Sequence, residues 1–315
     1  MTLPSLELPS PLHRLDVLSE LWNVDLWVKR DDLIPIFLGG NKVRKVHRLL
    51  QDALSSDRAP HVLITNGGVQ SNHARVVALM GARLGITTYL VLHGEKPSGT
   101  DLSGNAFFQH AAGANICYVD SEAISDTIKR LEGRERGAGR SVLIIPGGGH
   151  HASGAAAYSD AIRELPFAPE MIVHPSGTGG TQAGLIAGCS RAGMDVRVIG
   201  VSVARTEERG VAAIRTLLSV DTPGDAIIFN DAYRFGGYEQ SSRELDMFIA
   251  DIARLEGLPL DPTYTGKAMF ALRDLILKRE IEPGAKIVFW HTGGLLNLVT
   301  QKRSNSVRSC ASDPR

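Results

Sequence analysis

Cysteine is scarce in this sequence. The 315 residues include three cysteines, Cys117, Cys189 and Cys310, and no two of them are closely spaced. An odd and scattered set argues against a disulfide framework and against a zinc knuckle, so we expect no metal site. A chain of this kind is expected to be a reduced protein of the cytoplasm.

An excess of charge is also lacking, because 34 basic residues balance 34 acidic ones. The composition therefore gives no support for nucleic acid or an anionic membrane as the main partner. No apolar run reaches the roughly 18 residues that a membrane span requires. The opening MTLPSLELPSPLHRLD has no basic segment followed by an apolar one, so no signal peptide is expected. The closing QKRSNSVRSCASDPR has little to bury and is expected to be a mobile tail.

Hydrophobic residues make up 43% of the chain, and short β-type runs alternate with helical patterns. This alternation predicts an α/β protein with parallel sheets and helices on both faces. In such sheets a ligand binds at the carboxyl ends of the strands. Strands are predicted at 26–29, 61–65, 87–92, 115–119, 141–145, 171–174, 197–201 and 286–290. Predicted helices include 42–55, 72–84, 102–112, 181–192 and 266–278, and residues 133–140 (GRERGAGR) are expected to form a surface loop.

One glycine-rich turn has the features of a phosphate site. It consists of Ser176, Gly177, Thr178, Gly179, Gly180 and Thr181, between the apolar run MIVH and a predicted helix. Glycines let the backbone approach an oxyanion, the helix start presents free N–H groups, and Thr178 and Thr181 add hydroxyl donors. No Gly-Lys-Ser/Thr follows, so it is not a Walker A loop. A plain strand–turn–helix connection is the alternative.

A second stretch, GGNKVRK, places Lys42 in the first turn of a predicted helix, which Asn41 can cap. The helix dipole disfavours a cation there, so the pKa of the Lys42 amine is expected to fall, as suits a nucleophilic amine. An ordinary solvated lysine is the alternative for Lys42, and it is our expectation for Lys45.

Three further stretches follow predicted strands or open predicted helices. GGVQSNHAR places Gln70, Ser71, Asn72 and His73 at a helix start, where they could bind a carboxylate or a ring oxygen. DPTYTGKA holds Tyr264 between a proline and a glycine, and HTGG ends a strand at Thr292. The alternative for GGVQSNHAR is a simple helix cap with exposed polar residues. For Tyr264 it is packing in the core, and for HTGG it is a turn that ends the strand.

Together, GGNKVRK, GGVQSNHAR, SGTGGTQAG, DPTYTGKA and HTGG closely resemble the D-cysteine desulfhydrase and 1-aminocyclopropane-1-carboxylate deaminase family. The motifs occur in the family's order, and the resemblance runs from about residue 11 to about residue 298, with PLHRLD and WVKRDDL near its start. Members are pyridoxal-phosphate enzymes of fold type II, related to the tryptophan synthase β chain. The resemblance implies two α/β lobes with twisted parallel sheets and the cofactor in the cleft. We expect a small lobe at 47–160 and a large lobe comprising 1–46 and 161–315.

The resemblance also implies roles for single residues. Lys42 would carry the cofactor as a Schiff base, and the turn from Ser176 to Thr181 would hold its phosphate. Asn72 would bind the ring 3-oxygen, and Thr292 would meet the pyridine nitrogen. The substrate would contact Gln70, Ser71, Asn72, His73, Tyr238 and Tyr264, and the catalytic set would be Lys42, Ser71, Tyr238 and Tyr264.

The expected reaction is β-elimination from a small β-substituted amino acid such as D-cysteine, giving pyruvate, ammonia and sulfide, by a homodimer. Either Lys42 or a tyrosine would remove the α-proton. Ring-opening members resemble DPxYEG, whereas Thr265 follows the tyrosine here, which argues against that deaminase activity. His150 and His151 lie in a stretch where the family usually has a Gly-Gly-Ser-Asn-like turn. They could indicate an anionic substrate such as L-cysteate, or they could be exposed loop residues. A non-enzymatic protein that binds a phosphorylated metabolite is the remaining alternative.

Overall fold

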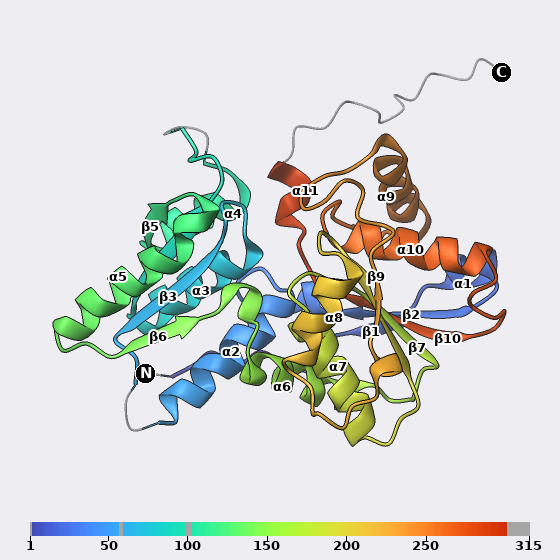
Figure 1. Cartoon of the computed structure of the whole chain (residues 1–315). Helices are drawn as coiled ribbons and strands as arrows, with labels where there is room; N and C mark the ends of the chain where they lie inside the picture. The colour runs from blue at the N-terminus through green and yellow to red at the C-terminus, as the bar shows by residue number, and fades with distance from the viewer. Residues whose placement is uncertain (1, 57–58, 99–101, 301–315) are drawn as a thin grey trace, which may run out of the picture.

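A computed structural model describes residues 2–56, 59–98 and 102–300, so the expected tail lies outside the described residues. Two separate sheets organise the chain, with α2 (Asn41–Leu54) running between them (Figure 1). This arrangement is an α/β fold, as predicted. None of the helices in the described ranges combines the length and apolarity that crossing a bilayer requires.

The larger sheet has six strands in the order β1-β2-β10-β7-β8-β9. Neighbouring strands run parallel, as predicted, except that β1 pairs antiparallel with β2 at one edge of the sheet. The central strand β7 is buried along its whole length, as an apolar strand covered on both faces should be. Its strands are Leu12–Arg14 (β1), Asp25–Arg30 (β2), Met171–Ser176 (β7), Arg197–Ser202 (β8), Ile228–Asn230 (β9) and Lys286–His291 (β10).

The smaller sheet has four parallel strands in the order β5-β4-β3-β6. They are Val62–Gly68 (β3), Thr87–His93 (β4), Asn115–Tyr118 (β5) and Val142–Ile145 (β6). All four strands fall within the predicted lobe 47–160, although the exact lobe boundaries stay a prediction. The helices are α1 Asp16–Trp22, α2 Asn41–Leu54, α3 Asn72–Leu84, α4 Gly104–Ala111, α5 Ile124–Gly137, α6 Ala152–Ala161, α7 Gly180–Arg191, α8 Glu207–Arg215, α9 Arg243–Glu256, α10 Thr265–Leu277 and α11 Leu296–Thr300.

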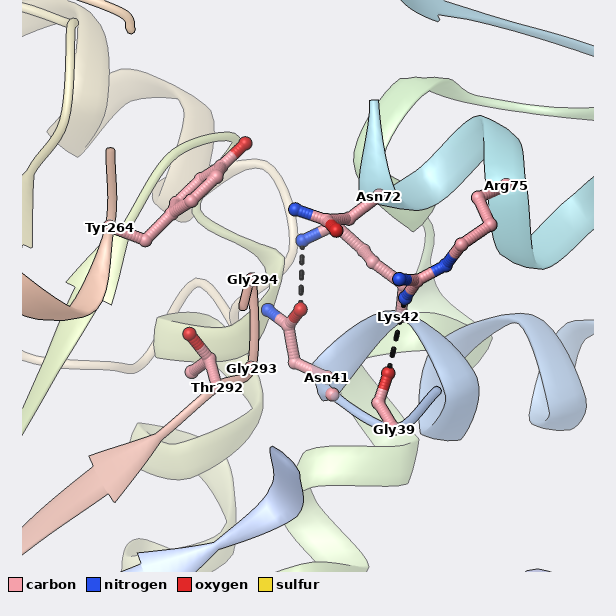
Figure 2. Close-up of a pocket in the computed structure, with 10 residues that line it drawn as sticks. Gly39, Asn41, Lys42, Asn72, Arg75, Tyr264, Thr292, Gly293 and Gly294 are labelled. Atoms are coloured by element: carbon pink, nitrogen blue, oxygen red, sulfur yellow. Dashed lines mark hydrogen bonds between the residues drawn. The ribbon is translucent and has the colours of Figure 1, made fainter. Parts of the chain in front are cut away.

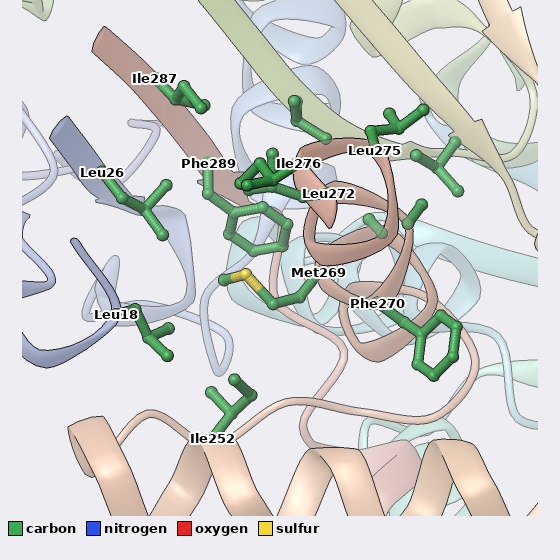
Figure 3. Packing of buried hydrophobic residues seen from close by; sticks show 14 of the residues in the cluster. Leu18, Leu26, Ile252, Met269, Phe270, Leu272, Leu275, Ile276, Ile287 and Phe289 are labelled. Atoms are coloured by element: carbon green, nitrogen blue, oxygen red, sulfur yellow. The ribbon is translucent and has the colours of Figure 1, made fainter. Parts of the chain in front are cut away.

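The main hydrophobic core lies where α1, α9 and α10 pack on one face of the larger sheet (Figure 3). Helix α10 contributes Met269 and Leu272, and strand β10 contributes Phe289, all fully buried. Burial of this much apolar surface, at about 25 cal/mol per Å², is the main force that fixes the sheet. It therefore holds the carboxyl ends of the strands in place for the site described below.

A buried charge network ties the start of α2 to the larger sheet. The Arg44 guanidinium donates to both oxygens of Asp31, at 3.0 and 2.8 Å, and to Glu164 at 2.6 Å. Tyr158 and Trp290 also donate to Asp31, at 2.6 and 2.8 Å. Burial raises the pKa of Asp31, but Arg44 and these donors outweigh it and hold the pKa below its ordinary value. The carboxylate is therefore charged, and it fixes α2 in position and rotation.

The eight predicted strands and five predicted helices are all present, with ends displaced by at most three residues. Residues 133–140 were expected to form a loop, and that is wrong for the first five, because α5 continues to Gly137. Charged side chains stabilise the end of this helix: Arg136 pairs with Glu132 one turn earlier, and fully buried Glu135 accepts from Arg134 and from Tyr89 on β4.

Candidate functional site

The candidate site lies at the carboxyl ends of β3, β7 and β10, where the first turns of α2, α3 and α7 converge. Two adjoining pockets share Asn41, Lys42 and Tyr264 in their linings. One extends toward α3, and its other lining residues are Gly39, Gly40, Asn72, Arg75, Thr292, Gly293 and Gly294 (Figure 2). The second extends toward α7, and its other lining residues are Lys45, Pro175, Ser176, Gly177, Thr178, Gly179 and Thr181.

A strained turn precedes Lys42. Phe37, Leu38, Gly39 and Gly40 all have positive φ, at 50°, 63°, 64° and 93°. For a residue other than glycine this conformation costs about 1–3 kcal/mol. A Cβ at Gly39 would overlap the Asp32 carbonyl, and one at Gly40 would lie 2.9 Å from the Thr292 carbonyl oxygen. The two glycines therefore let the chain pass close to β10 before α2 begins.

Asn41 does not cap α2 as predicted, because Gly40 is the N-cap residue. The Asn41 side chain instead joins the two pockets. Its Oδ1 accepts from Lys42 Nζ at 3.0 Å, and its Nδ2 donates to Thr181 Oγ1 at 3.1 Å.

Lys42 projects its amine into the space between the two pockets (Figure 2). Burial first, and then the charge of Arg75, lower the pKa of this amine to about 8. The lowered pKa of Lys42 agrees in direction with the prediction. Its causes are burial and the charge of Arg75, whereas we expected the helix dipole to be the cause. A substantial fraction of Lys42 is therefore neutral near pH 8, as a nucleophile for an aldehyde must be.

The predicted phosphate turn forms a cup at the start of α7. Gly179, the N-cap residue, has φ 87°, and a Cβ on it would lie 2.7 Å from Ile214. The Ser176 hydroxyl is buried without a hydrogen-bond partner among the described residues. A buried, unpaired hydroxyl and a helix N-terminus in one cavity are what an oxyanion requires.

Lys45 belongs to this cup, and the expectation that it is solvated is wrong. Its side chain is 1% exposed, and Nζ lies 3.1 Å from where a Cβ on Gly180 would be. Its hydrogen bond to the Gly148 carbonyl is long, at 3.4 Å. Burial, and then Lys42, hold the pKa of Lys45 well below its ordinary value. A dianion in the cup would reverse that effect and make Lys45 its counter-charge.

The four polar residues that open α3 have different roles. Ser71 caps the helix, accepting from Ala74 N at 3.2 Å, and Gln70 Oε1 accepts from Asn105 N at 2.9 Å, at the start of α4. His73 is 2% exposed and bonds Thr65 at 2.9 Å. Asn72 is the one of the four that lines either of the two pockets described above, and its Oδ1 is buried with no partner among the described residues.

Arg75 lines the same pocket, although it was not among the site residues predicted from the sequence. It follows Asn72 by one helical turn, is 2% exposed, and donates to the Gly39 carbonyl at 3.3 Å (Figure 2). An arginine three residues after a helix start is common on protein surfaces, so its burial could be learned only from the fold.

Tyr238 and Tyr264 meet at the site, as the prediction of a tyrosine pair requires. Their hydroxyls are 2.7 Å apart, and their rings pack edge to face at 5.9 Å. Burial raises the pKa of both phenols above the ordinary value. Both are therefore protonated at neutral pH and can donate. Thr265, by contrast, is fully buried and donates to Asp261 at 2.7 Å.

The two histidines of the unusual turn are outside the linings of the two pockets, although His150 lies beside the phosphate cup, where it interacts with the Thr178 backbone and the Lys45 charge. His151 is exposed and caps α6, accepting from Ser153 N at 3.2 Å. His150 Nε2 bonds Thr216 at 3.2 Å. Neither is among the residues that line the two pockets.

Known proteins with similar sequences match nearly the whole chain. The family described as "Pyridoxal-phosphate dependent enzyme" matches residues 3–293. A Pyrococcus horikoshii protein named "Putative 1-aminocyclopropane-1-carboxylate deaminase" is 35% identical over 298 residues, covering 91% of this chain and 89% of that one. A Yersinia pestis "D-cysteine desulfhydrase" is 35% identical over 306 residues, covering 90% and 91%.

Solved structures agree in fold. An "ACC deaminase homologue" superimposes with a TM-score of 0.82 at 34% identity, covering 93% of this chain and 91% of the other. A hydrogen sulfide-producing enzyme from Fusobacterium nucleatum superimposes with a TM-score of 0.70 at 15% identity, covering 91% and 96%, which shows the fold alone. The chain therefore belongs to the pyridoxal-phosphate dependent enzyme family and is a lyase of the 1-aminocyclopropane-1-carboxylate deaminase and D-cysteine desulfhydrase type.

Proposed function

We propose that the chain eliminates the β-substituent of a small amino acid such as D-cysteine, giving pyruvate, ammonia and sulfide. The observation that carries this proposal is the pair of tyrosine hydroxyls, 2.7 Å apart, of which Tyr264 lines the same pocket as Lys42. An amine that accepts the α-proton and a phenol that donates to the leaving sulfur are the two groups that an elimination needs.

The residues present fit pyridoxal phosphate. The unpaired Ser176 hydroxyl, the N–H groups at the start of α7 and the Lys45 amine would hold the phosphate. Lys42 would bind the aldehyde carbon, Asn72 would donate to the ring oxygen, and Thr292 would face the ring nitrogen. The chemistry that pyridoxal phosphate supplies when bound is withdrawal of electrons from the α-carbon of an amino acid.

The protein supplies the proton transfers and the orientation. Lys42, with a pKa of about 8, can accept a proton near neutral pH, whereas the raised pKa values of Tyr238 and Tyr264 make phenolate a poor base there. This favours Lys42 as the base and the tyrosines as donors. A neutral Thr292 hydroxyl does not enforce a proton on the ring nitrogen, which favours prompt loss of the β-substituent after the α-proton leaves.

Ring opening of 1-aminocyclopropane-1-carboxylate is the second candidate, because relatives at 34–35% identity carry that name. The fully buried Thr265, bonded to Asp261 where ring-opening members have glutamate after the tyrosine, weighs against it. The L-cysteate alternative is weaker, because His151 is exposed and His150 lies beside the phosphate cup. By family resemblance we also propose a homodimer in the cytoplasm, for which sedimentation would test the dimer.

A substrate panel scored for keto acid tests the proposal. D-Cysteine, L-cysteine, β-chloroalanine, L-cysteate and 1-aminocyclopropane-1-carboxylate would each be incubated with the holoenzyme. Pyruvate and sulfide from D-cysteine are expected, whereas 2-oxobutanoate from the cyclopropane substrate would favour the second candidate.

The cofactor anchor is tested separately by reducing the holoenzyme with borohydride and mapping the labelled peptide. We expect the label on Lys42, its loss in Lys42→Ala, and no change in Lys278→Ala, a variant of the 55%-exposed lysine that caps the end of α10. A Lys42→Ala protein that kept the parent's visible absorbance would contradict the assignment.

A further inference from the structure

Arg75 is a buried cation whose role the proposed function does not explain. It sits on α3 with 2% exposure and makes one hydrogen bond, to the Gly39 carbonyl at 3.3 Å, while its Nε has no partner among the described residues. Burial lowers its pKa to about 10, and no carboxylate of the described ranges forms an ion pair with it. Arg75 therefore keeps its charge at neutral pH without a counter-ion, which is costly in a structural arginine and points to a functional reason.

The carbonyl that Arg75 contacts belongs to the strained turn before Lys42. In that turn four consecutive residues, 37–40, have positive φ, and Gly40 caps α2. A charge-assisted hydrogen bond to Gly39 holds the turn from the side of the smaller sheet, and packing of Gly40 against Thr292 holds it from the larger one. Arg75 thus reaches the backbone two residues before the helix that carries Lys42.

Arg75 also acts electrostatically on the Lys42 amine, and its own charge is permanent at neutral pH. The titratable groups that face Lys42 are Lys45 on α2, His73 and Arg75 on α3, His174 on β7, and Tyr264 and Asp261 before α10. Burial lowers the pKa of His73 to about 3 and of His174 to about 4, so both are neutral. Burial raises the pKa of Tyr264, which is neutral too.

Lys45 and Asp261 do not replace Arg75 in this role. Lys45 faces the phosphate cup, where a bound dianion would neutralise its charge. Asp261 lies behind Gly294, and its carboxylate accepts from the backbone N–H groups of Thr263, Tyr264 and Thr265. Among the described residues that face Lys42, Arg75 alone carries a positive charge that no bound group or carboxylate offsets.

We propose that Arg75 is a positioning residue of the active site: its guanidinium clamps the strained turn at Gly39 and holds an uncompensated positive charge beside Lys42, so that the Lys42 nitrogen gives up its proton more readily. The inference rests on the proposed function, because it takes Lys42 as the cofactor anchor. The unpaired charge of Arg75 acts on the Lys42 amine, because two buried cations in one pocket repel each other and the weaker base gives up its proton.

The test is the pH titration of the holoenzyme's visible absorbance, which reports protonation at the Lys42 nitrogen, for parent, Arg75→Gln, Arg75→Lys and Arg48→Gln. Arg75→Gln removes the charge, and its midpoint should rise by about one pH unit. Arg75→Lys keeps a charge, and its midpoint should stay at or below the parent value. Arg48→Gln alters a half-exposed arginine on α2 and should leave the midpoint unchanged.

Each outcome of the titration either supports or overturns the proposed role of Arg75. An Arg75→Gln midpoint equal to the parent's, with the borohydride label on Lys42, would overturn the proposal. A label on another residue would instead refute the proposed function. If Arg75→Gln does not fold, Arg75→Lys still decides, because a raised midpoint there would show that charge at this position does not control the nitrogen. A fall in activity without a moved midpoint would leave Arg75 as a structural clamp and contradict its electrostatic role.

Discussion

Substituting Asp31 by asparagine tests whether the buried network at the start of α2 carries much of the protein's stability. The carboxylate is fully buried and accepts from Arg44, Tyr158, Trp290 and Ser10. An amide keeps one acceptor oxygen but presents NH2 where the other oxygen was, so donors on that side lose their partner. Removing one member of a buried ion pair costs about 3–5 kcal/mol. Because Arg44 keeps Glu164 at 2.6 Å, we expect the lower end, about 3 kcal/mol.

The measurement is thermal and urea unfolding of the holoenzyme, followed by circular dichroism. A loss of about 3 kcal/mol corresponds to a melting temperature lower by about 6 °C in a chain of this size. The matched control is Asp52→Asn on α2, the helix that carries Arg44, where Asp52 is 45% exposed and pairs with Arg48. That exposed pair is worth about 0–1 kcal/mol, so the control should melt close to the parent.

The dependence on pH gives a second check on the Asp31 prediction. The pKa of Asp31 is depressed in the folded protein, so its stabilisation is present above the unfolded value near pH ~4 and is lost as the pH falls through the folded value. The stability gap between parent and Asp31→Asn should therefore narrow in acid. If Asp31→Asn melted with Asp52→Asn at neutral pH, the network would not hold α2 and this reasoning would be wrong.

Three further results are expected. Lys45→Met should weaken binding of pyridoxal phosphate by about tenfold to a hundredfold, measured by titrating cofactor into the apoprotein, because a charge-assisted contact to the phosphate is lost; unchanged affinity would place Lys45 outside the phosphate site. Tyr238→Phe should lower kcat for D-cysteine by about a hundredfold but spare β-chloroalanine, whose chloride leaves without a proton; equal losses on both substrates would argue against a tyrosine donor. Because the neutral amine of Lys42 increases as pH rises through its pKa of about 8, kcat should rise across that range, and a pH-independent kcat would remove Lys42 as the base.

Much of the fold could be predicted because the strands are apolar runs bounded by glycine. The two missed strands, β1 and β9, are three residues long, too short for a periodic pattern to show. The phosphate turn was predicted from local chemistry, since all its residues are contiguous. The roles of Lys45 and Arg75 were not predicted, because they depend on contacts between residues that are far apart in the sequence. Their burial comes from residues more than 30 positions away, such as Gly180 and Gly39, and no local pattern distinguishes them from surface cations.

Helix α2 presents Lys42, Arg44 and Lys45 in three directions, toward the substrate pocket, the Asp31 network and the phosphate cup. Each residue of an α-helix turns by about 100°. Adding or removing a single residue between Gly40 and Lys45 would thus turn at least one of these side chains away from the group that it contacts, while leaving the helix itself intact. Point substitutions can be absorbed one at a time, but a change of length here cannot. We therefore expect descendants of this gene to tolerate insertions in their surface loops but to keep the length of this segment constant. Sequences of diverged relatives could then be aligned without gaps at this segment.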